Sequence, residues 1–348
     1  MKRILSLVLC AALSLSLLTG CGPKDAPAGS GSASGAVSGT VSSTDASKPV
    51  AENVINFNAL SGPTGMGAAK LMEDCAAPGS LLSLKSEVVA EPKAVIDALV
   101  SGSVDIAAVP TNVASVLANK TKGGVQVLAV NTLGVLYILE KGDTVHSMAD
   151  LKGKTLYAVG QGSNPEYVLN YLLTENGVNP ADVDIQFLEG QEITAKMASS
   201  EAGICMLPVP AATALMMKDQ GVREAVSLSE AWDELDKGPL PQGCVVARTQ
   251  FVQENPLLVD RFLDAYEDSI DFMEDEDNLT AAAALVAKYG IAPNEKIAAQ
   301  ALPQASLTFE DGDDMKEMLV NYYNVLMKAD PKSIGGALPT DGFYYGVD

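Results

Sequence analysis

Two short turns carry the polar groups that are best placed to hold a small molecule. The first is Ser61-Gly62-Pro63-Thr64-Gly65, and the second is Gly160-Gln161-Gly162-Ser163-Asn164. Each turn precedes a helical pattern, with Thr64 as a candidate N-cap and Pro165 suited to the first helical position. The free N–H groups at such helix starts carry about half a positive charge. They could hold nitrate, sulfonate, phosphate or carboxylate without a full cation.

The two turns belong to a strand–turn–helix unit that occurs twice, about a hundred residues apart. The first copy has a predicted strand at 54–60 and a predicted helix at 66–74. The second copy has a strand at 154–159 and a helix at 166–176, which ends at a glycine. The repeat indicates that the chain consists of two similar halves.

A second unit repeats at almost the same spacing. Strands that end in proline are predicted at 104–110 and 203–208, helices after them at 111–119 and 211–219, and amphipathic helices before them at 93–100 and 192–198. Two such units per half, joined by right-handed crossovers, predict a doubly wound α/β lobe. Ligands bind at the carboxyl ends of the strands in open α/β sheets, which is where both turns lie.

The connections between the halves predict that the chain crosses twice. The apolar stretch 125–139, broken by Asn131-Thr132-Leu133-Gly134, leaves the first lobe, and the strand 243–248 returns to it. Lobe one is therefore expected at 54–132 plus 243–348, and lobe two at 133–242. The helices that complete lobe one are predicted at 250–274, 278–289 and 313–328. Two crossing strands make a hinge that is suited to closing on a ligand.

The N-terminus has the features of an export signal. Lys2 and Arg3 precede an apolar run at 4–18, which is too short for a confident membrane span. The run ends in Leu18-Thr19-Gly20-Cys21, which resembles a bacterial lipobox. We expect a signal peptide at 1–20, a lipid on Cys21, and a flexible Gly/Ser linker over the rest of 21–50. The mature protein would then be extracytoplasmic and anchored to the bacterial cell membrane by its lipid.

Composition excludes several classes of protein. The net charge of -21 argues against a nucleic-acid partner. His146 is the single histidine, so His-based metal sites and serine-hydrolase triads are not expected, and no P-loop, GxSxG or HExxH motif occurs. No cofactor and no metal are expected. Cys75, Cys205 and Cys244 leave open either one disulfide or buried free thiols.

Several segments, taken in order, resemble the substrate-binding lipoproteins of bacterial ABC importers. The branch is the nitrate, sulfonate, taurine and thiamine-pyrimidine (SsuA/NMT1-like) binding group. Besides the lipobox, the matching segments are 60–65, 102–107, 148–154, 208–212 and 250–256. The resemblance implies a two-lobed fold of the periplasmic binding protein type II class with a two-strand hinge. It also implies a monomer that binds a small molecule between its lobes and docks on an ABC permease with its ATPase.

The resemblance also assigns the binding residues, because in this group loops and helix starts of both lobes hold the ligand. The candidates are Ser61, Gly62, Thr64, Gly65, Met66, Pro110, Thr111 and Asn112 from lobe one, and Gln161, Gly162, Ser163, Asn164 and Pro208 from lobe two. Arg248 is the one arginine expected near the cleft, where it is a candidate ligand contact, with a surface ion pair as the favoured alternative. Tyr137, Tyr157 and Tyr167 could stack on a ligand. Since arginine is scarce, a neutral or partly aromatic solute remains an alternative to an anion.

Three functions follow from this resemblance. The first is a receptor that captures a solute and delivers it to an importer. The second is a sensing lipoprotein that feeds no transporter. The third is an enzyme on the same fold, since one branch makes the thiamine pyrimidine with clustered cysteines and a reactive histidine. This chain has no cysteine cluster, so we expect no catalysis and no catalytic residue.

Overall fold

The computed structural model describes residues 54–90 and 92–347. The predicted signal peptide, the lipidation site Cys21 and the linker up to residue 50 lie outside the described residues. No helix in the described ranges is long and apolar enough to cross a membrane.

Six strands form the first sheet, in the order β11-β4-β10-β3-β1-β2. They are β1 (Val54–Leu60), β2 (Ser83–Val89), β3 (Ile106–Pro110), β4 (Val125–Thr132), β10 (Gly243–Arg248) and β11 (Leu307–Glu310). β1 pairs in parallel with β2 and β3, whereas β10 runs antiparallel to β3 and β4. This sheet therefore combines strands from both ends of the described chain, as the predicted return strand at 243–248 required.

Five strands form the second sheet, in the order β7-β6-β8-β5-β9. They are β5 (Leu136–Lys141), β6 (Thr155–Ala158), β7 (Asp184–Phe187), β8 (Gly203–Pro208) and β9 (Val222–Ser227). β6 is parallel to β7 and β8, and β5 is antiparallel to β8 and β9. Two separate α/β sheets confirm the predicted fold class.

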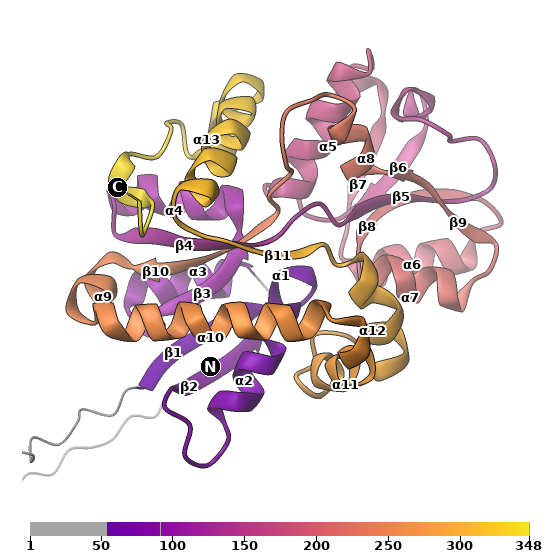
Figure 1. The fold of residues 1–348 in the computed structure, drawn as a ribbon. Coiled ribbons are helices and arrows are strands. Elements are labelled where there is room, and N and C mark those ends of the chain that lie inside the picture. Colours follow the sequence, from indigo (N-terminus) through magenta and orange to yellow (C-terminus); the bar gives the residue numbers. More distant parts are fainter. Residues whose placement is uncertain (1–53, 91, 348) are drawn as a thin grey trace, which may run out of the picture. The chain divides into compact units, whose positions relative to one another are not determined.

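Helices cover both faces of each sheet. Those of the first sheet are α1 (Pro63–Met66), α2 (Ala69–Cys75), α3 (Pro92–Ser101), α4 (Thr111–Thr121), α9 (Thr249–Glu254), α10 (Pro256–Glu274), α11 (Leu279–Lys288), α12 (Glu295–Ala301) and α13 (Gly312–Ala329). Those of the second sheet are α5 (Asn164–Glu175), α6 (Gly190–Ser199), α7 (Ala211–Lys218) and α8 (Leu228–Asp233). In Figure 1, α10 lies along one face of the first sheet, and α4 and α13 lie on the other.

Alternation along the strands divides the apolar side chains among three cores. Ile55, Phe57 and Ala59 of β1 join the core beneath α2, α10 and α11, because successive strand residues point to opposite faces. A second core lies under α3, α4 and α13 and continues into the second sheet, where Trp232 packs 5.8 Å from the ring of Tyr322. A third core lies under α6 and α7. The shared second core joins the two sheets.

The chain crosses between the sheets twice in neighbouring segments. β4 ends at Thr132 in the first sheet and β5 begins at Leu136 in the second, so the predicted break at 131–134 marks a crossing. The segment before β10 runs back beside it, since the N–H of Gln242 donates to the carbonyl of Thr132 at 2.9 Å. Two adjacent crossings limit the relative movement of the sheets to bending about these segments.

The structure corrects the predicted helix at 66–74 and the N-cap assigned to Thr64. Two helices, α1 and α2, replace the single helix, and the N-cap of α1 is Gly62, with φ of 101°. Pro63 explains the early start, because its fixed φ and missing N–H suit the first helical turn. Thr64 therefore lies inside the helix. Pro165 likewise falls one position later than expected, since α5 begins at Asn164.

The disulfide that the sequence left open does not form among the described residues. Cys75, Cys205 and Cys244 are free thiols. Burial raises the pKa of Cys205 to about 12 and that of Cys75 to about 11, where the charge of Asp74 adds to the effect. Burial also raises the pKa of Cys244, so all three thiols stay protonated at neutral pH.

A buried ion pair in the second sheet makes its stability depend on pH. Glu140 on β5 has a side chain only 3% exposed and lies 2.6 Å from the guanidinium of Arg223 on β9. Burial alone raises the pKa of Glu140, but hydrogen bonds from Thr144 and Val145 and the charge of Arg223 outweigh it, so the net pKa lies below the ordinary 4.5. Because the pKa is lowered on folding, the stabilisation is present above 4.5 and disappears as the pH falls through the folded-state pKa.

We therefore expect Glu140→Gln to lower the free energy of unfolding by about 2 kcal/mol at pH 7, the size of hydrogen bonds to a charged group. The difference in unfolding free energy between the variant and the native protein should shrink as the pH falls from 4.5 through the folded-state pKa of Glu140, because protonation neutralises the native carboxylate. Urea denaturation of both proteins, at pH 7 and at a pH well below 4.5, measures this difference. A penalty that is the same at both pH values would contradict this assignment.

Candidate functional site

Four strand ends bring the predicted turns to the region where the two sheets meet. In the first sheet β1 and β3 are parallel, and α1 and α4 follow their carboxyl ends. In the second sheet β6 and β8 are parallel, and α5 and α7 follow theirs (Figure 1). These ends are the positions at which open α/β sheets bind ligands.

The turn after β1 is partly exposed to solvent, and buried hydrogen bonds fix its position. Ser61 is exposed and Gly62 is half-buried, whereas Thr64, Gly65 and Met66 are buried. A Cβ on Gly65 would lie 2.1 Å from the carbonyl oxygen of Leu60, so only glycine fits there. Asn131 on β4 fixes the turn by donating from Nδ2 to the carbonyl of Thr64 at 3.0 Å and to the hydroxyl of Tyr266 at 2.8 Å.

The turn after β6 presents most of its polar groups to solvent. Gln161 and Gly162 are exposed, and Ser163 is half-buried. Ser163 is the N-cap of α5, but its side chain makes no capping hydrogen bond. The N–H of Gly162 donates to Oε2 of Glu166 at 2.5 Å. The carboxylate of Glu166 therefore already occupies one of the N–H groups that was expected to bind an anion.

The first turns of α4 and α5 contact each other through a reciprocal pair of asparagines. The N–H of Asn112 donates to Oδ1 of Asn164 at 3.3 Å, and the N–H of Asn164 donates to Oδ1 of Asn112 at 3.1 Å. Each side chain thus caps the helix of the other sheet. We call Asn112 and Asn164 the asparagine pair, and both are about 1% exposed.

Further buried groups satisfy the remaining hydrogen-bonding atoms of the pair. Nδ2 of Asn164 donates to Oγ1 of Thr111 at 2.9 Å and to the carbonyl of Gln242 at 2.8 Å. The hydroxyl of Tyr322 donates to Oδ1 of Asn164, and that of Tyr323 to the carbonyl of Thr111. Burial raises the pKa of both tyrosines well above 10, so both remain proton donors. The network places groups from the second crossing and from α13 around one contact.

The structure brings Thr111, Asn112 and Asn164 together, but their polar groups form hydrogen bonds with one another. The ligand contacts assigned to these three residues remain predictions, and they require the asparagine pair to separate or to rearrange. Pro110 and Pro208 are half-buried at the ends of β3 and β8. Ser61, Gly62, Gln161, Gly162 and Ser163 are the candidates with polar groups open to solvent in this arrangement.

Arg248 lies at the wrong end of its strand for a ligand contact. Because β10 is antiparallel to β3, Gly243 is opposite Pro110 while Ala247 is opposite Ile106. Arg248 forms an ion pair with Asp105 at 2.5 Å, and its Nε donates to the carbonyl of Val104. The expectation that Arg248 lies near the cleft is therefore wrong, since the strand direction carries it to the opposite edge of the sheet.

The aromatic candidates occupy different environments. Tyr137 is half-buried on β5, and burial together with the charges of Glu224 and Glu230 raises its pKa. The ring of Tyr157 has the ammonium of Lys196 5.1 Å from its centre. Tyr167 lies on α5 and faces α13 rather than the strand ends. These three rings do not form one aromatic wall.

Four buried side-chain atoms in the described part of the chain lack a hydrogen-bond partner, on Asn170, Thr213, Gln242 and Gln304. Nε2 of Gln242, a residue 7% exposed, makes no hydrogen bond, and neither does Oγ1 of Thr213, a residue 4% exposed on α7. Gln242 stands between Pro241 and Gly243 in the second crossing. A glutamine inside a proline-rich apolar segment was the available signal. Across the described ranges, no group of three His, Cys, Asp or Glu side chains could hold a metal ion.

Comparisons with known proteins agree on the fold. The profile of a family described as NMT1/THI5 like matches residues 82–278. No curated protein matches the chain. The solved structure of an ABC transporter from Parabacteroides distasonis has a TM-score of 0.71 at 21% identity, covering 84% of this chain and 98% of that one.

Two sulfonate-binding proteins are also similar in structure. The periplasmic aliphatic sulphonate binding protein SsuA from Escherichia coli has a TM-score of 0.69 at 15% identity, with 84% of this chain and 97% of that chain covered. The alkanesulfonate-binding protein SsuA from Xanthomonas axonopodis pv. citri, bound to MOPS, has a TM-score of 0.65 at 14% identity, with 85% and 98% covered. At these identities the likeness establishes the fold.

We expect the asparagine pair to show strong energetic coupling. Asn112→Ala and Asn164→Ala should each lower the free energy of unfolding by about 1–3 kcal/mol, because each leaves a buried N–H without its acceptor. The double variant should lose less than the sum, with a coupling energy of about 0.5–3 kcal/mol. Urea denaturation of the four proteins measures this cycle. Asn176→Ala, at the exposed end of α5, is the control. Its effect on the free energy of unfolding should add to that of Asn112→Ala. Additive effects of Asn112→Ala and Asn164→Ala would contradict the pairing.

Proposed function

The chain belongs to the NMT1/THI5-like family, and on that premise we propose that it is an extracytoplasmic solute-binding protein. It captures a small molecule between its two lobes and delivers it to an ABC importer through a permease and its ATPase. Lobe one consists of 54–132 plus 243–348, and lobe two of 133–242. The protein acts as a monomer held at the bacterial membrane by a lipid on Cys21.

The contact between the starts of α4 and α5 is the observation that carries this proposal. Asn112 follows β3 in one sheet, Asn164 follows β6 in the other, and the two are in hydrogen-bond contact. The carboxyl ends of these strands therefore face each other across the boundary between the sheets. A solute held at such ends touches both sheets at once, and this allows its binding to be coupled to lobe closure.

The polar groups around the turns favour a ligand without strong negative charge. The first N–H groups of α4 and α5 are capped by neutral amides, and Arg248 is paired with Asp105 away from the turns. The open groups are the hydroxyls of Ser61 and Ser163 and the amide of Gln161. We infer a small polar solute recognised through hydroxyl and amide groups. A sulfonate, the solute class of two structurally similar binding proteins, is the alternative outcome of the test below.

A ligand-sensing lipoprotein that feeds no transporter would use the same binding site. Its ligand binding would match that of a transport receptor, so genes for a permease and an ATPase beside this one would favour transport. The pyrimidine-precursor synthase finds no support, because the free thiols at 75, 205 and 244 lie on separate elements. The proposal therefore assigns no catalytic residue and no cofactor.

We expect a chain that begins at residue 50 to melt cooperatively and to respond to one chemical class of solute. A ligand at 100 times its Kd adds about 2.7 kcal/mol of stability, which shifts the Tm by several degrees at this size. The panel contains nitrate, alkyl sulfonates, taurine, thiamine pyrimidines, riboflavin and amino acids, tested after partial unfolding and dialysis. A Tm that no member of the panel shifts would contradict solute capture of these classes, and a shift with sulfonates alone would overturn the inference of a weakly charged ligand.

Once a ligand is identified, we expect Gly162→Ala to weaken its binding at least tenfold by placing a Cβ on the exposed turn. Gly153→Ala is the matched control, since Gly153 and Gly162 have φ of 75° and 72° and neither added Cβ meets an atom within 4 Å. Each change should lower the free energy of unfolding by about 1–2 kcal/mol, the cost of a left-handed conformation. Calorimetric titration measures the affinities. Equal affinities in the two variants would remove this turn from the site.

A further inference from the structure

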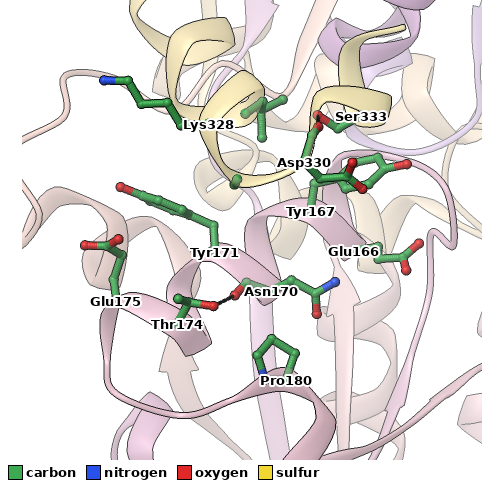
Figure 2. A pocket seen from close by; sticks show the side chains of 12 residues that line it. Glu166, Tyr167, Asn170, Tyr171, Thr174, Glu175, Pro180, Lys328, Asp330 and Ser333 are labelled. Carbon is green, nitrogen blue, oxygen red and sulfur yellow. Dashed lines mark hydrogen bonds between the residues drawn. The ribbon is translucent and has the colours of Figure 1, made fainter. Parts of the chain in front are cut away.

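A groove of about 470 Å³ lies between α5 and the segment that links α13 to the 3₁₀ turn Pro331–Ile334. Its walls come from both sheets, because α5 belongs to the second and α13 packs on the first. Figure 2 shows Tyr167, Asn170 and Tyr171 from α5 on one side and Asp330 and the stem of Lys328 on the other. None of the candidate turn residues lines it. A volume of this size is within the range of small-molecule pockets.

Acidic groups predominate in the groove. Glu166, Glu175 and Asp330 contribute three carboxylates, against the single ammonium of Lys328. In the described part of the chain no basic side chain forms an ion pair with any of the three, and the Lys328 ammonium lies on the side away from Asp330 (Figure 2). The protein as a whole carries a net charge of -21. The electrostatic potential in the groove therefore favours a cation.

Two aromatic rings and one unpartnered acceptor give the groove further selectivity. Tyr171 is fixed by Trp232, whose ring centre is 5.3 Å away, and Tyr167 lies one helical turn earlier. Ring faces attract cations within about 6 Å of the centre. Burial raises the pKa of both tyrosines, and the charges of nearby carboxylates add to the effect, so both stay neutral. Asn170, a half-buried residue of the same helix, also lines the groove, and its Oδ1 is shielded from solvent without a hydrogen-bond partner.

We propose that this groove binds a small organic cation, a protonated primary amine, at a site separate from the proposed solute site. The ammonium donates to Oδ1 of Asn170 and to a carboxylate, while its alkyl part lies against the tyrosine rings. The carboxylates and the tyrosine rings are complementary to this group, and an acceptor without a donor leaves a hydrogen bond to be made. An anion would face three carboxylates, and a neutral molecule would make weaker hydrogen bonds to them than an ammonium does.

The position of the groove ties amine binding to the arrangement of the two sheets. Helix α5 begins at Asn164 of the asparagine pair and continues through Tyr167, Asn170 and Tyr171. An amine that touches both α5 and Asp330 stabilises the arrangement in which the asparagine pair is formed. An amine bound in the groove therefore favours the arrangement in which the asparagine pair is formed. This inference does not depend on which solute binds at the turns.

The test is calorimetric titration of the full chain in detergent with 1,5-diaminopentane at low salt. 1,5-Pentanediol has the same length without charge and serves as the control ligand. Asn170→Ala removes the unpartnered acceptor, and Asp330→Asn removes one charge but keeps the oxygen that accepts from the Lys332 N–H. Glu201→Gln removes one exposed charge outside the groove and is the matched control variant.

We expect the diamine to bind, the diol not to bind, and both groove variants to weaken the diamine at least tenfold while Glu201→Gln leaves it unchanged. Three results would overturn the proposal. The diamine does not bind, or the diol binds equally well, or Glu201→Gln weakens binding as much as Asp330→Asn does. Binding that is lost in Gly162→Ala but kept in both groove variants would place the amine at the turns instead and would also overturn it.

Discussion

The contact between Asn112 and Asn164 is the constraint on which the arrangement of the two sheets depends. Two helix starts would repel each other, because each carries partial positive charge and free N–H groups. The asparagine side chains remove this conflict by supplying an acceptor to the opposite helix. The remaining hydrogen bonds come from Thr111, Tyr322, Tyr323 and the carbonyl of Gln242 in the second crossing. The ends of β3 and β6 can therefore lie against each other without leaving the first N–H groups of α4 and α5 unsatisfied.

This contact also determines which helix N-termini remain available to bind a ligand. A fold with four strand ends at one boundary offers four helix starts to a ligand, and the simplest expectation is an anion site. Here two of the starts cap each other, and Glu166 accepts from the N–H of Gly162 beside them. Hydroxyl and amide groups on the turns remain open. Because these hydrogen bonds occupy the N–H groups that would attract an anion, we expect a weakly charged solute whose binding is coupled to lobe closure.

The repeated pattern of the sequence was sufficient to predict the central strands of both sheets, because strand and helix periodicity are local properties. The strands at 54–60, 203–208 and 243–248 have the predicted bounds, and the break at 131–134 marks a crossing. The strands β2, β7, β9 and β11 were not predicted. All four lie at the edges of their sheets, where few side chains are buried and the apolar pattern is weak. Pro63, and not Thr64, determines where α1 begins, because its fixed φ and missing N–H suit the first helical turn. The asparagine pair depends on residues 52 positions apart meeting across two sheets, and no local pattern encodes that.

Amide hydrogen exchange at Asn112 and Asn164 tests the central claim most directly. First-turn amides of a helix normally exchange fast, because they have no partner within the helix. The reciprocal pair predicts that both are slowed by at least about a hundredfold relative to an exposed amide such as that of Gln161, equivalent to an opening free energy of about 2.7 kcal/mol. Both should also lose protection together in Asn164→Ala. Exchange of the two amides as fast as that of Gln161 in the unmodified protein would contradict the account.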